Sequence, residues 1–307
     1  MVETQSLPPA GFVEKIVQTD IRNPETSGVS RTFRFVGKVD QVYFNRESGM
    51  VILRDWKTCA NAAQTERLKM LSFQADLYAC AIEDLGFIVD AAEFCLIERP
   101  SIRLCGKDAN PAAYEARCLE WLKQEGKLVQ FYIPSTRERR LNARRWLWDI
   151  SKQILEARRA ERFVCNEQAC YNWQRECPYM PLCLARAQGH DWRSVLVDDY
   201  VLAPLHPELE GYEGRADLLT YSAASCFVLC QAKYEWRYEM AIRPKVEESS
   251  DALNAGINVH KGLELALTTG LDSGLASIPD VLGIDEKGVQ DRAKARAMVR
   301  AAFEKWG

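Results

Sequence analysis

Apolar and polar side chains alternate near the start of the chain. The clearest run is FRFVGKVDQVYF at residues 33–44, and the turn-forming residues NRESG separate it from a second apolar run, MVILRDWK. Successive side chains of a strand point to opposite faces of a sheet, so a period of two predicts strands. We expect strands at residues 12–22, 32–44 and 50–58, with the last two joined as a hairpin.

The remaining apolar residues recur mostly with the spacing of helices. Helices are expected at residues 65–86, 111–126, 136–160, 222–240, 251–269 and 289–305, and one more strand at residues 91–98. A mixed central sheet flanked by helices on both sides is an α/β sandwich. The 307 residues, of which 47% are hydrophobic, can bury a globular core in one large domain or two small ones.

Charged residues within the hairpin indicate a metal site. The hairpin brings Asp40 and Asp55 side by side, and Lys57 projects from the same face of the sheet as Asp55. Two converging carboxylates repel each other unless a cation lies between them, and their hard oxygen ligands suit Mg²⁺ or Mn²⁺. Such an ion can activate water for attack on a phosphodiester, and Lys57 can position that water or offset the phosphate charge. The alternative is an ordinary hairpin with surface charges, which D-x-K alone would favour.

The helix expected after the hairpin carries two more polar residues on one face. Gln74 and Tyr78 are four residues apart, which is the spacing of neighbours on a helix surface. They could contact a DNA backbone or hold the hairpin lysine in place. The alternative is a half-buried amphipathic helix in which the pair has no catalytic role.

Taken in order, the segments G-x-x-D, D-x-K and Q-x-x-x-Y resemble the PD-(D/E)xK nucleases of the RecB type, which include CRISPR-associated and phage exonucleases. They stand here at residues 37–40, 55–57 and 74–78. The resemblance implies a restriction-endonuclease-like core in which Asp40 and Asp55 hold the metal, with the backbone carbonyl of Trp56 as a further ligand. It also implies a histidine ahead of the hairpin, but no histidine precedes Asp40 in this chain.

A histidine in the expected setting lies near the other end. The segment GINVHKGLE, residues 256–264, resembles the end of the family's opening helix, which implies that His260 completes the metal site. The family's parts would then stand in circularly permuted order. Residues 1–209 would hold the core and the cysteine-rich segment, 210–217 a linker, and 218–307 the opening helices of one assembled nuclease domain. A natural permutation, an engineered one and a fragment of two tandem copies all fit; a lone helical histidine is otherwise usually structural.

The chain has eleven cysteines, no recognisable signal peptide and no apolar run long enough to span a membrane. We therefore expect reduced thiols and a cytoplasmic protein of a bacterial or phage-infected cell, without membrane association. Part of the RecB-type family carries a [4Fe–4S] cluster, and residues 165–183, CNEQACYNWQRECPYMPLC, resemble its cysteine-rich tail. The resemblance implies the ligands Cys170, Cys177, Cys183 and Cys230, with Cys165 and Cys226 as spare candidates. Zinc and a site without metal are the alternatives.

The overall charge does not favour nucleic-acid binding. The net charge is −3 and the sequence pI is about 5.8, so DNA contacts would rely on local patches. One candidate is TRERRLNARRW at residues 136–146, followed by Arg158, Arg159 and Arg162. The alternative is a solvated helix whose tryptophans face the core.

Together these features predict a metal-dependent DNA nuclease with a structural iron–sulfur cluster. An exonuclease acting on single-stranded or end-bearing DNA is expected, a preference that comes from the resemblance alone. The alternative is a non-catalytic DNA-binding module built around an iron–sulfur cluster or zinc. Homo-oligomers and partners in DNA repair, recombination or CRISPR systems are left open.

Overall fold

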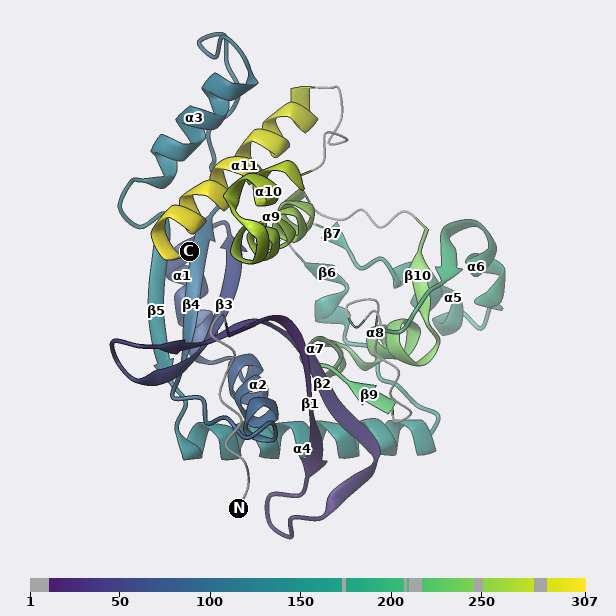
Figure 1. Cartoon of the computed structure of the whole chain (residues 1–307). Helices are drawn as coiled ribbons and strands as arrows, with labels where there is room; N and C mark the ends of the chain where they lie inside the picture. Colours follow the sequence, from purple (N-terminus) through teal and green to yellow (C-terminus); the bar gives the residue numbers. More distant parts are fainter. Residues whose placement is uncertain (1–10, 173–174, 207–208, 210–216, 246–250, 279–285) are drawn as a thin grey trace.

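A mixed six-stranded sheet forms the centre of an α/β fold in the computed structural model, which describes residues 11–172, 175–206, 209, 217–245, 251–278 and 286–307 (Figure 1). The strands are β1 (Phe12–Arg22), β2 (Val29–Asn45), β3 (Met50–Cys59), β4 (Ala91–Glu98), β5 (Leu128–Pro134) and β9 (Asp217–Leu219). Neighbouring strands run antiparallel, except that β3 with β4 and β2 with β9 are parallel. The expected α/β sandwich with a mixed central sheet is confirmed.

The long strand β2 carries two different strands along one edge. β3 pairs with its second half, at residues 41–45, and β9 pairs with its first half, at Phe33–Phe35. β1 occupies the opposite edge. Among the described residues, positions 36–40 of β2 therefore have no strand partner on the β3 side, and Asp40 ends this gap.

Helices cover both faces of the sheet and enclose two apolar cores. One core includes Leu53 and Phe94, and the other includes Trp56 and Cys95, because alternate residues of β3 and β4 face opposite ways. The first core is covered by α2 (Gln74–Glu83), α4 (Arg137–Arg159) and α7 (Tyr221–Leu229). The second is covered by α3 (Pro111–Leu122), α9 (Asp251–Thr269), α10 (Leu271–Ala276) and α11 (Glu286–Trp306), which lie together in Figure 1.

A smaller apolar cluster holds the cysteine-rich part of the chain beside segments far along the sequence. Its buried residues are Tyr179, Leu182, Tyr200, Trp236 and Ile242. The elements here are α5 (Met180–Ala187), α6 (Arg193–Asp199), α8 (Gln231–Tyr234), a π-helix (Glu235–Glu239), a 3₁₀ turn (Glu167–Ala169), and the strand pairs β6 (Tyr171–Asn172) with β7 (Arg175–Glu176) and β8 (Tyr200–Leu202) with β10 (Ile242–Pro244). None of the described helices combines the length and the hydrophobicity that a bilayer crossing requires.

Two expected helices are each divided in the structure. The helix expected at residues 65–86 is α1 (Ala62–Met70) followed by α2, because the chain turns at Ser72, whose Oγ accepts the N–H of Gln74. The helix expected at residues 222–240 breaks at Cys230, which is extended with φ −161°. Apolar spacing continues across both breaks, so periodicity alone did not reveal them.

The sequence analysis predicted none of the strands β5 to β10 and none of the helices α5, α6 and α10. The helix expected at residues 111–126 ends at Leu122, and Gly126, with φ of +78°, reverses the chain into β5. The short helix α10 follows α9 directly after Gly270. Of the predicted linker at residues 210–217, Asp217 begins β9 and the remainder lies outside the described residues.

Helix α2 packs against β2 at a glycine. A Cβ atom built at Gly37 would overlap the ring of Tyr78, closer than real Cβ contacts allow. The Gly37 backbone therefore touches a buried aromatic ring, and only a residue without a side chain leaves the ring in place. This contact sets the distance between α2 and the strand that carries Asp40.

We predict that Gly37→Ala lowers the free energy of unfolding by about 1–3 kcal/mol, because the added methyl group overpacks the Tyr78 contact. Urea denaturation measures the change. Gly106→Ala is the control, since nothing lies within 4 Å of a Cβ there, and its effect should stay within about 0.5 kcal/mol. Equal stability of the two variants would show that the Tyr78 ring moves aside freely.

Candidate active site

The candidate active site lies where β2 and β3 separate. Their ladder ends at the pair Gln41 and Arg54, one step before Asp40 and Asp55. Beyond this point the Asp40 carboxylate replaces a backbone acceptor, because the N–H of Trp56 donates to Asp40 Oδ2 at 2.7 Å. The side chain of Asp40 thus fills the gap between the diverging strands.

Lys57 holds one oxygen of Asp55 and leaves the other unpaired. Lys57 Nζ donates to Asp55 Oδ1 at 2.7 Å and to the backbone carbonyl oxygen of Trp56 at 3.2 Å. Asp55 is 4% exposed, and its Oδ2 is buried without a hydrogen-bond partner among the described residues. A buried carboxylate oxygen without a partner is unfavourable, so this atom is a natural ligand for a cation.

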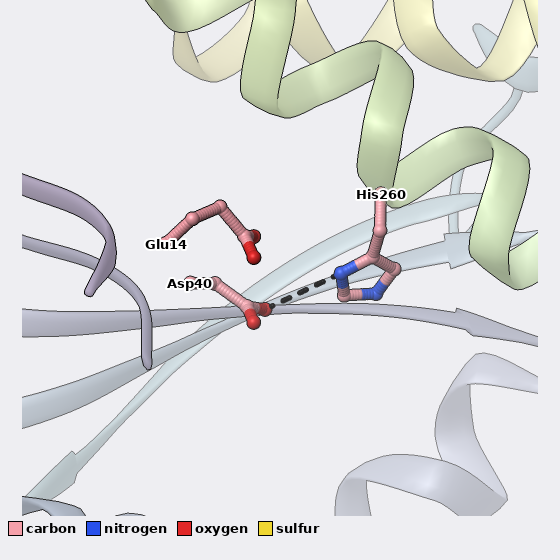
Figure 2. A group of neighbouring side chains, drawn as sticks. All are labelled: Glu14, Asp40 and His260. Atoms are coloured by element: carbon pink, nitrogen blue, oxygen red, sulfur yellow. Dashed lines mark ion pairs between the residues drawn. The ribbon is translucent and has the colours of Figure 1, made fainter. Parts of the chain in front are cut away.

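Helix α9 places His260 at the same point. His260 Nδ1 lies 3.7 Å from Asp40 Oδ2, and Figure 2 shows the imidazole directed at the carboxylate. Val259 and Leu263 bury the neighbouring side of the helix in the second core. Gly256 allows α9 to approach β3 closely, since a Cβ there would lie 3.1 Å from Thr58 Oγ1.

The sequence analysis missed one carboxylate of this group. Glu14 of β1 lies beside Asp40 and His260, and the donor atoms of all three are within 4.8 Å of one another (Figure 2). The Glu14 carboxylate also forms a 2.5 Å ion pair with Lys38. Glu14 belongs to no recognisable motif, and only the register of β1 against β2 could have indicated it.

The close negative charges shift the ionisation of the site. Burial raises the pKa of Asp40, and Asp55 raises it further, against the opposing charges of Lys57 and His260. Burial also raises the pKa of Glu14 despite its hydrogen bond from Lys38. For Lys57, burial acts to lower the pKa, but Asp55 and Asp40 outweigh it and raise the pKa. The lysine is therefore fully protonated at neutral pH.

The donor set fits a hard divalent cation. Carboxylate oxygens, with an imidazole nitrogen at the edge, suit Mg²⁺ or Mn²⁺. The unpaired Oδ2 of Asp55 and the raised pKa of Asp40 both indicate that the negative charge here is not fully compensated by the protein. These residues can hold such an ion, although Lys57 occupies the Trp56 carbonyl that was expected as an additional ligand.

A model of the PD-(D/E)XK nuclease superfamily matches residues 5–184, more than half of the chain. The chain belongs to this superfamily. No curated protein and no solved structure matches it. The matched segment contains Asp40, Asp55 and Lys57, whereas His260 lies outside it. Superfamily members hydrolyse phosphodiester bonds with divalent metal ions, so the protein is a nuclease in general terms.

A second polar row extends the site of this superfamily member toward α1 and α2. Gln74 Nε2 donates to Tyr78 Oη at 3.2 Å, and Lys69 Nζ donates to Gln74 Oε1 at 3.4 Å. Burial raises the pKa of Tyr78 to about 12. Burial, assisted by the charge of Lys57, lowers the pKa of Lys69. The sequence analysis missed Lys69 because it follows no motif.

The cysteines of the cysteine-rich segment lie near one another and near Cys230, close enough for their thiols to interact electrostatically. The N–H of Asn166 donates to Cys230 Sγ at 3.4 Å, and Trp236 Nε1 donates to Cys183 Sγ at 3.3 Å. The N–H of Cys177 donates to the carbonyl of Cys170 at 2.7 Å. These contacts tie the segment around residues 165–183 to α8 and the π-helix.

The spare candidate Cys165 lies within this thiol group. Its Sγ is 3.9 Å from that of Cys170. Burial raises the pKa of Cys165 to about 12, and the nearby thiols of Cys183 and Cys230 add to the effect. Burial also raises the pKa of Cys177 and of Cys183. Thiols with raised pKa values that lie together are readily ionised by a bound metal, whose positive charge reverses the shift.

The arginine-rich helix α4 agrees better with the structural alternative than with a DNA-binding patch. Arg139 forms a 2.8 Å ion pair with Asp76, and Arg144 forms one of 2.8 Å with Glu83. Trp146 packs between Phe73 and Tyr221, with ring centroids 5.9 Å and 5.8 Å away. These side chains hold α4 against α2 and α7.

The raised pKa of Asp40 gives a pH dependence of stability. Folding favours the protonated carboxyl, so the stabilisation is complete below the ordinary pKa of 3.8 and is lost as the pH rises through the higher folded value. We predict that, with EDTA present, the parent loses unfolding free energy relative to Asp40→Asn as the pH rises from the ordinary pKa of 3.8 through the higher folded value. The loss is about 1.4 kcal/mol for each unit by which the pKa is raised.

Urea denaturation at a series of pH values measures both proteins. The control is Asp149→Asn, which changes an exposed carboxylate of α4. If Asp40→Asn and the parent keep a constant difference across this range, Asp40 is not crowded by the charges around it.

Proposed function

We propose that this superfamily member is a Mg²⁺- or Mn²⁺-dependent deoxyribonuclease, acting as an exonuclease on single-stranded or end-bearing DNA. The observation that carries the proposal is the meeting of Asp40, Asp55, Lys57 and His260 where β2 and β3 separate. Membership of a nuclease superfamily supports the reaction class. The preference for ends rests on the resemblance to RecB-type enzymes.

Each residue of the group has a distinct proposed role. Asp40, Asp55 and His260 would hold the cation, with the Trp56 carbonyl joining them when Lys57 turns away. The bound ion would lower the pKa of the attacking water and offset the charge that develops on the phosphate. Lys57 would orient that water and donate to a phosphate oxygen. Because its pKa is raised, Lys57 remains protonated and is suited to donating hydrogen bonds rather than to accepting a proton.

The row formed by Lys69, Gln74 and Tyr78 would act on the same phosphodiester from the side of α1 and α2. Tyr78, with a pKa of about 12, stays neutral, and its hydroxyl can donate a hydrogen bond to a phosphate oxygen. Lys69 supplies a second positive charge near Lys57. Burial and the charge of Lys57 lower its pKa, against the opposing effect of Asp55 and Asp40, so its ammonium would be stabilised by a further bound anion. A phosphate group would be such an anion.

The catalytic proposal is tested with end-labelled single-stranded DNA and Mn²⁺. Lys57→Ala should lower the rate of cleavage by about 10²-fold or more, because it removes a donor to the developing oxyanion. Lys152→Ala, an exposed change on α4, is the matched control and should cleave like the parent. Circular single-stranded DNA, tested in parallel, should resist cleavage if free ends are required.

Cleavage that persists unchanged in Lys57→Ala would remove this site from the reaction. If the folded, Mn²⁺-loaded parent binds DNA without cutting it, the alternative of a non-catalytic DNA-binding module is the better account. Cutting of the circular substrate would leave the nuclease in place and overturn its exonuclease preference.

We further propose a structural [4Fe–4S] cluster held by Cys170, Cys177, Cys183 and Cys230. The gathering of these thiols around contacts from Asn166 and Trp236 supports it, and four thiolates are the usual ligand set of such a cluster. The cluster would fasten the cysteine-rich segment to α8. Cys165 lies close enough to Cys170 to replace one ligand, and zinc is the alternative metal.

The cluster predicts a coloured protein after anaerobic purification, with iron and sulfide in equal amounts. Cys183→Ser should lose most of both, together with visible absorption, and should unfold at a lower temperature because metal binding is coupled to folding. Cys105→Ser changes an exposed cysteine elsewhere and should keep the metal. A colourless protein with stoichiometric zinc would replace the cluster with a zinc site.

We also propose that residues 1–209 and 218–307 assemble as one nuclease domain in permuted order. Two features support this assembly: β9 completes the sheet beside β2, and α9 brings His260 to Asp40. Both features join the later segment to the sheet that carries the proposed metal site.

A further inference from the structure

We propose that Glu14 is an additional ligand of the same divalent cation, supplied by β1 and held ready by Lys38. This inference rests on the proposed function. The carboxylate of Glu14 lies with the donor atoms of Asp40 and His260 inside one group whose members are within 4.8 Å of each other. A buried oxygen that lacks a hydrogen-bond partner among the described residues, Asp55 Oδ2, belongs to β3, on the other side of β2 from Glu14.

The register of β1 on β2 puts Glu14 directly opposite Asp40. Val13 pairs with Gln41 and Lys15 pairs with Val39, so Glu14 and Asp40 occupy the position between these pairs. The like charges of residues opposite each other in adjacent strands repel. A cation bound by both carboxylates would attract each of them and so offset this repulsion.

The backbone of Glu14 is adjusted at this position. Its φ is +51°, a left-handed conformation that is uncommon for a residue other than glycine and unusual within a strand. This conformation changes the direction of the side chain relative to the regular alternation of β1. Local strain of this kind is found preferentially at functional sites, where surrounding contacts maintain it.

Lys38 compensates Glu14 only in part. Its ammonium pairs with the Glu14 carboxylate at 2.5 Å, while Lys57 pairs with Asp55. Glu14, Asp40 and Asp55 therefore lie near Lys38 and Lys57, with Lys69 acting on the two aspartates from α1 and Glu264 adding negative charge beside Glu14. Among the described residues, the group whose donor atoms lie together consists of Glu14, Asp40 and His260, and the imidazole is its basic member. A purely structural salt bridge would need neither the left-handed backbone nor the approach to Asp40.

The metal-binding role and a structural role predict opposite effects for two substitutions. Glu14→Gly removes the carboxylate and accepts the left-handed φ without strain, whereas Glu14→Gln retains the side-chain volume and removes only the charge. If Glu14 is a ligand, both variants should bind Mn²⁺ at least about 10-fold more weakly than the parent. Metal-free Glu14→Gly should unfold at a temperature equal to or above that of the metal-free parent.

Isothermal titration with Mn²⁺ and thermal unfolding with Mn²⁺ or EDTA provide the two readouts, and neither depends on cleavage. Glu25→Gln, an exposed change near the β1–β2 turn, is the matched control and should keep the parent affinity and the full Mn²⁺-induced rise in Tm. The parent should show both, and the two Glu14 variants should lose most of that rise.

Parent-like Mn²⁺ affinity in Glu14→Gln and Glu14→Gly would overturn the inference, and a fall in metal-free Tm for both would then assign Glu14 a structural pairing with Lys38. Binding that is lost in Asp40→Asn but kept in the Glu14 variants would uphold the proposed metal site without Glu14. Failure of the parent itself to bind Mn²⁺ would overturn the metal site and the inference together.

Discussion

Crowded negative charge at the junction of three strands is the constraint on which the rest of the site depends, with Asp55 buried and Asp40 and Glu14 half-buried. Asp55 pairs with Lys57 and Glu14 with Lys38, while Asp40 accepts the Trp56 N–H and lies 3.7 Å from His260 Nδ1. Two unit charges 4 Å apart interact by about 4 kcal/mol at the effective dielectric of a protein surface. Small shifts of any of these strands therefore change the repulsion between the carboxylates. A cation bound between them would stabilise the whole junction.

The same constraint explains why the residues of the recognisable sequence segments have such different roles. The glycine of G-x-x-D is not part of the candidate metal site; it makes room for the tyrosine of Q-x-x-x-Y. Tyr78 in turn positions Gln74, and Gln74 reaches Lys69. The two segments are thus halves of one packing contact, which sets how far the helix row stands from Asp40 and Lys57. The ring of Tyr78 therefore sets the position of the helix row relative to the strand junction.

The sequence was informative where local pattern decides structure. Alternation and the turn residues identified the β2–β3 hairpin, and the spacing of Asp55 and Lys57 placed them on one face. Glu14 escaped because its relation to Asp40 depends on the register between two strands and on a left-handed backbone, neither of which leaves a periodic signal. The break at Cys230 escaped for a related reason: contacts with Asn166 favour the extended conformation, whereas the apolar spacing of the surrounding residues favours a helix.

The part of the chain outside the superfamily match is as important to the junction as the matched part. Arg54, next to Asp55, forms a buried ion pair with Glu93 and donates to the carbonyl of Trp306 at 2.6 Å, so the last helix is fixed to the strand that carries Asp55. Breaking such a buried pair by removing one partner is unfavourable by about 3–5 kcal/mol. Since α9 packs between α11 and β3, this anchor also determines where His260 meets Asp40. The helices that follow the superfamily match are therefore packed as part of the sheet's own core. The position of His260 depends on the packing of α11 as much as on α9 itself.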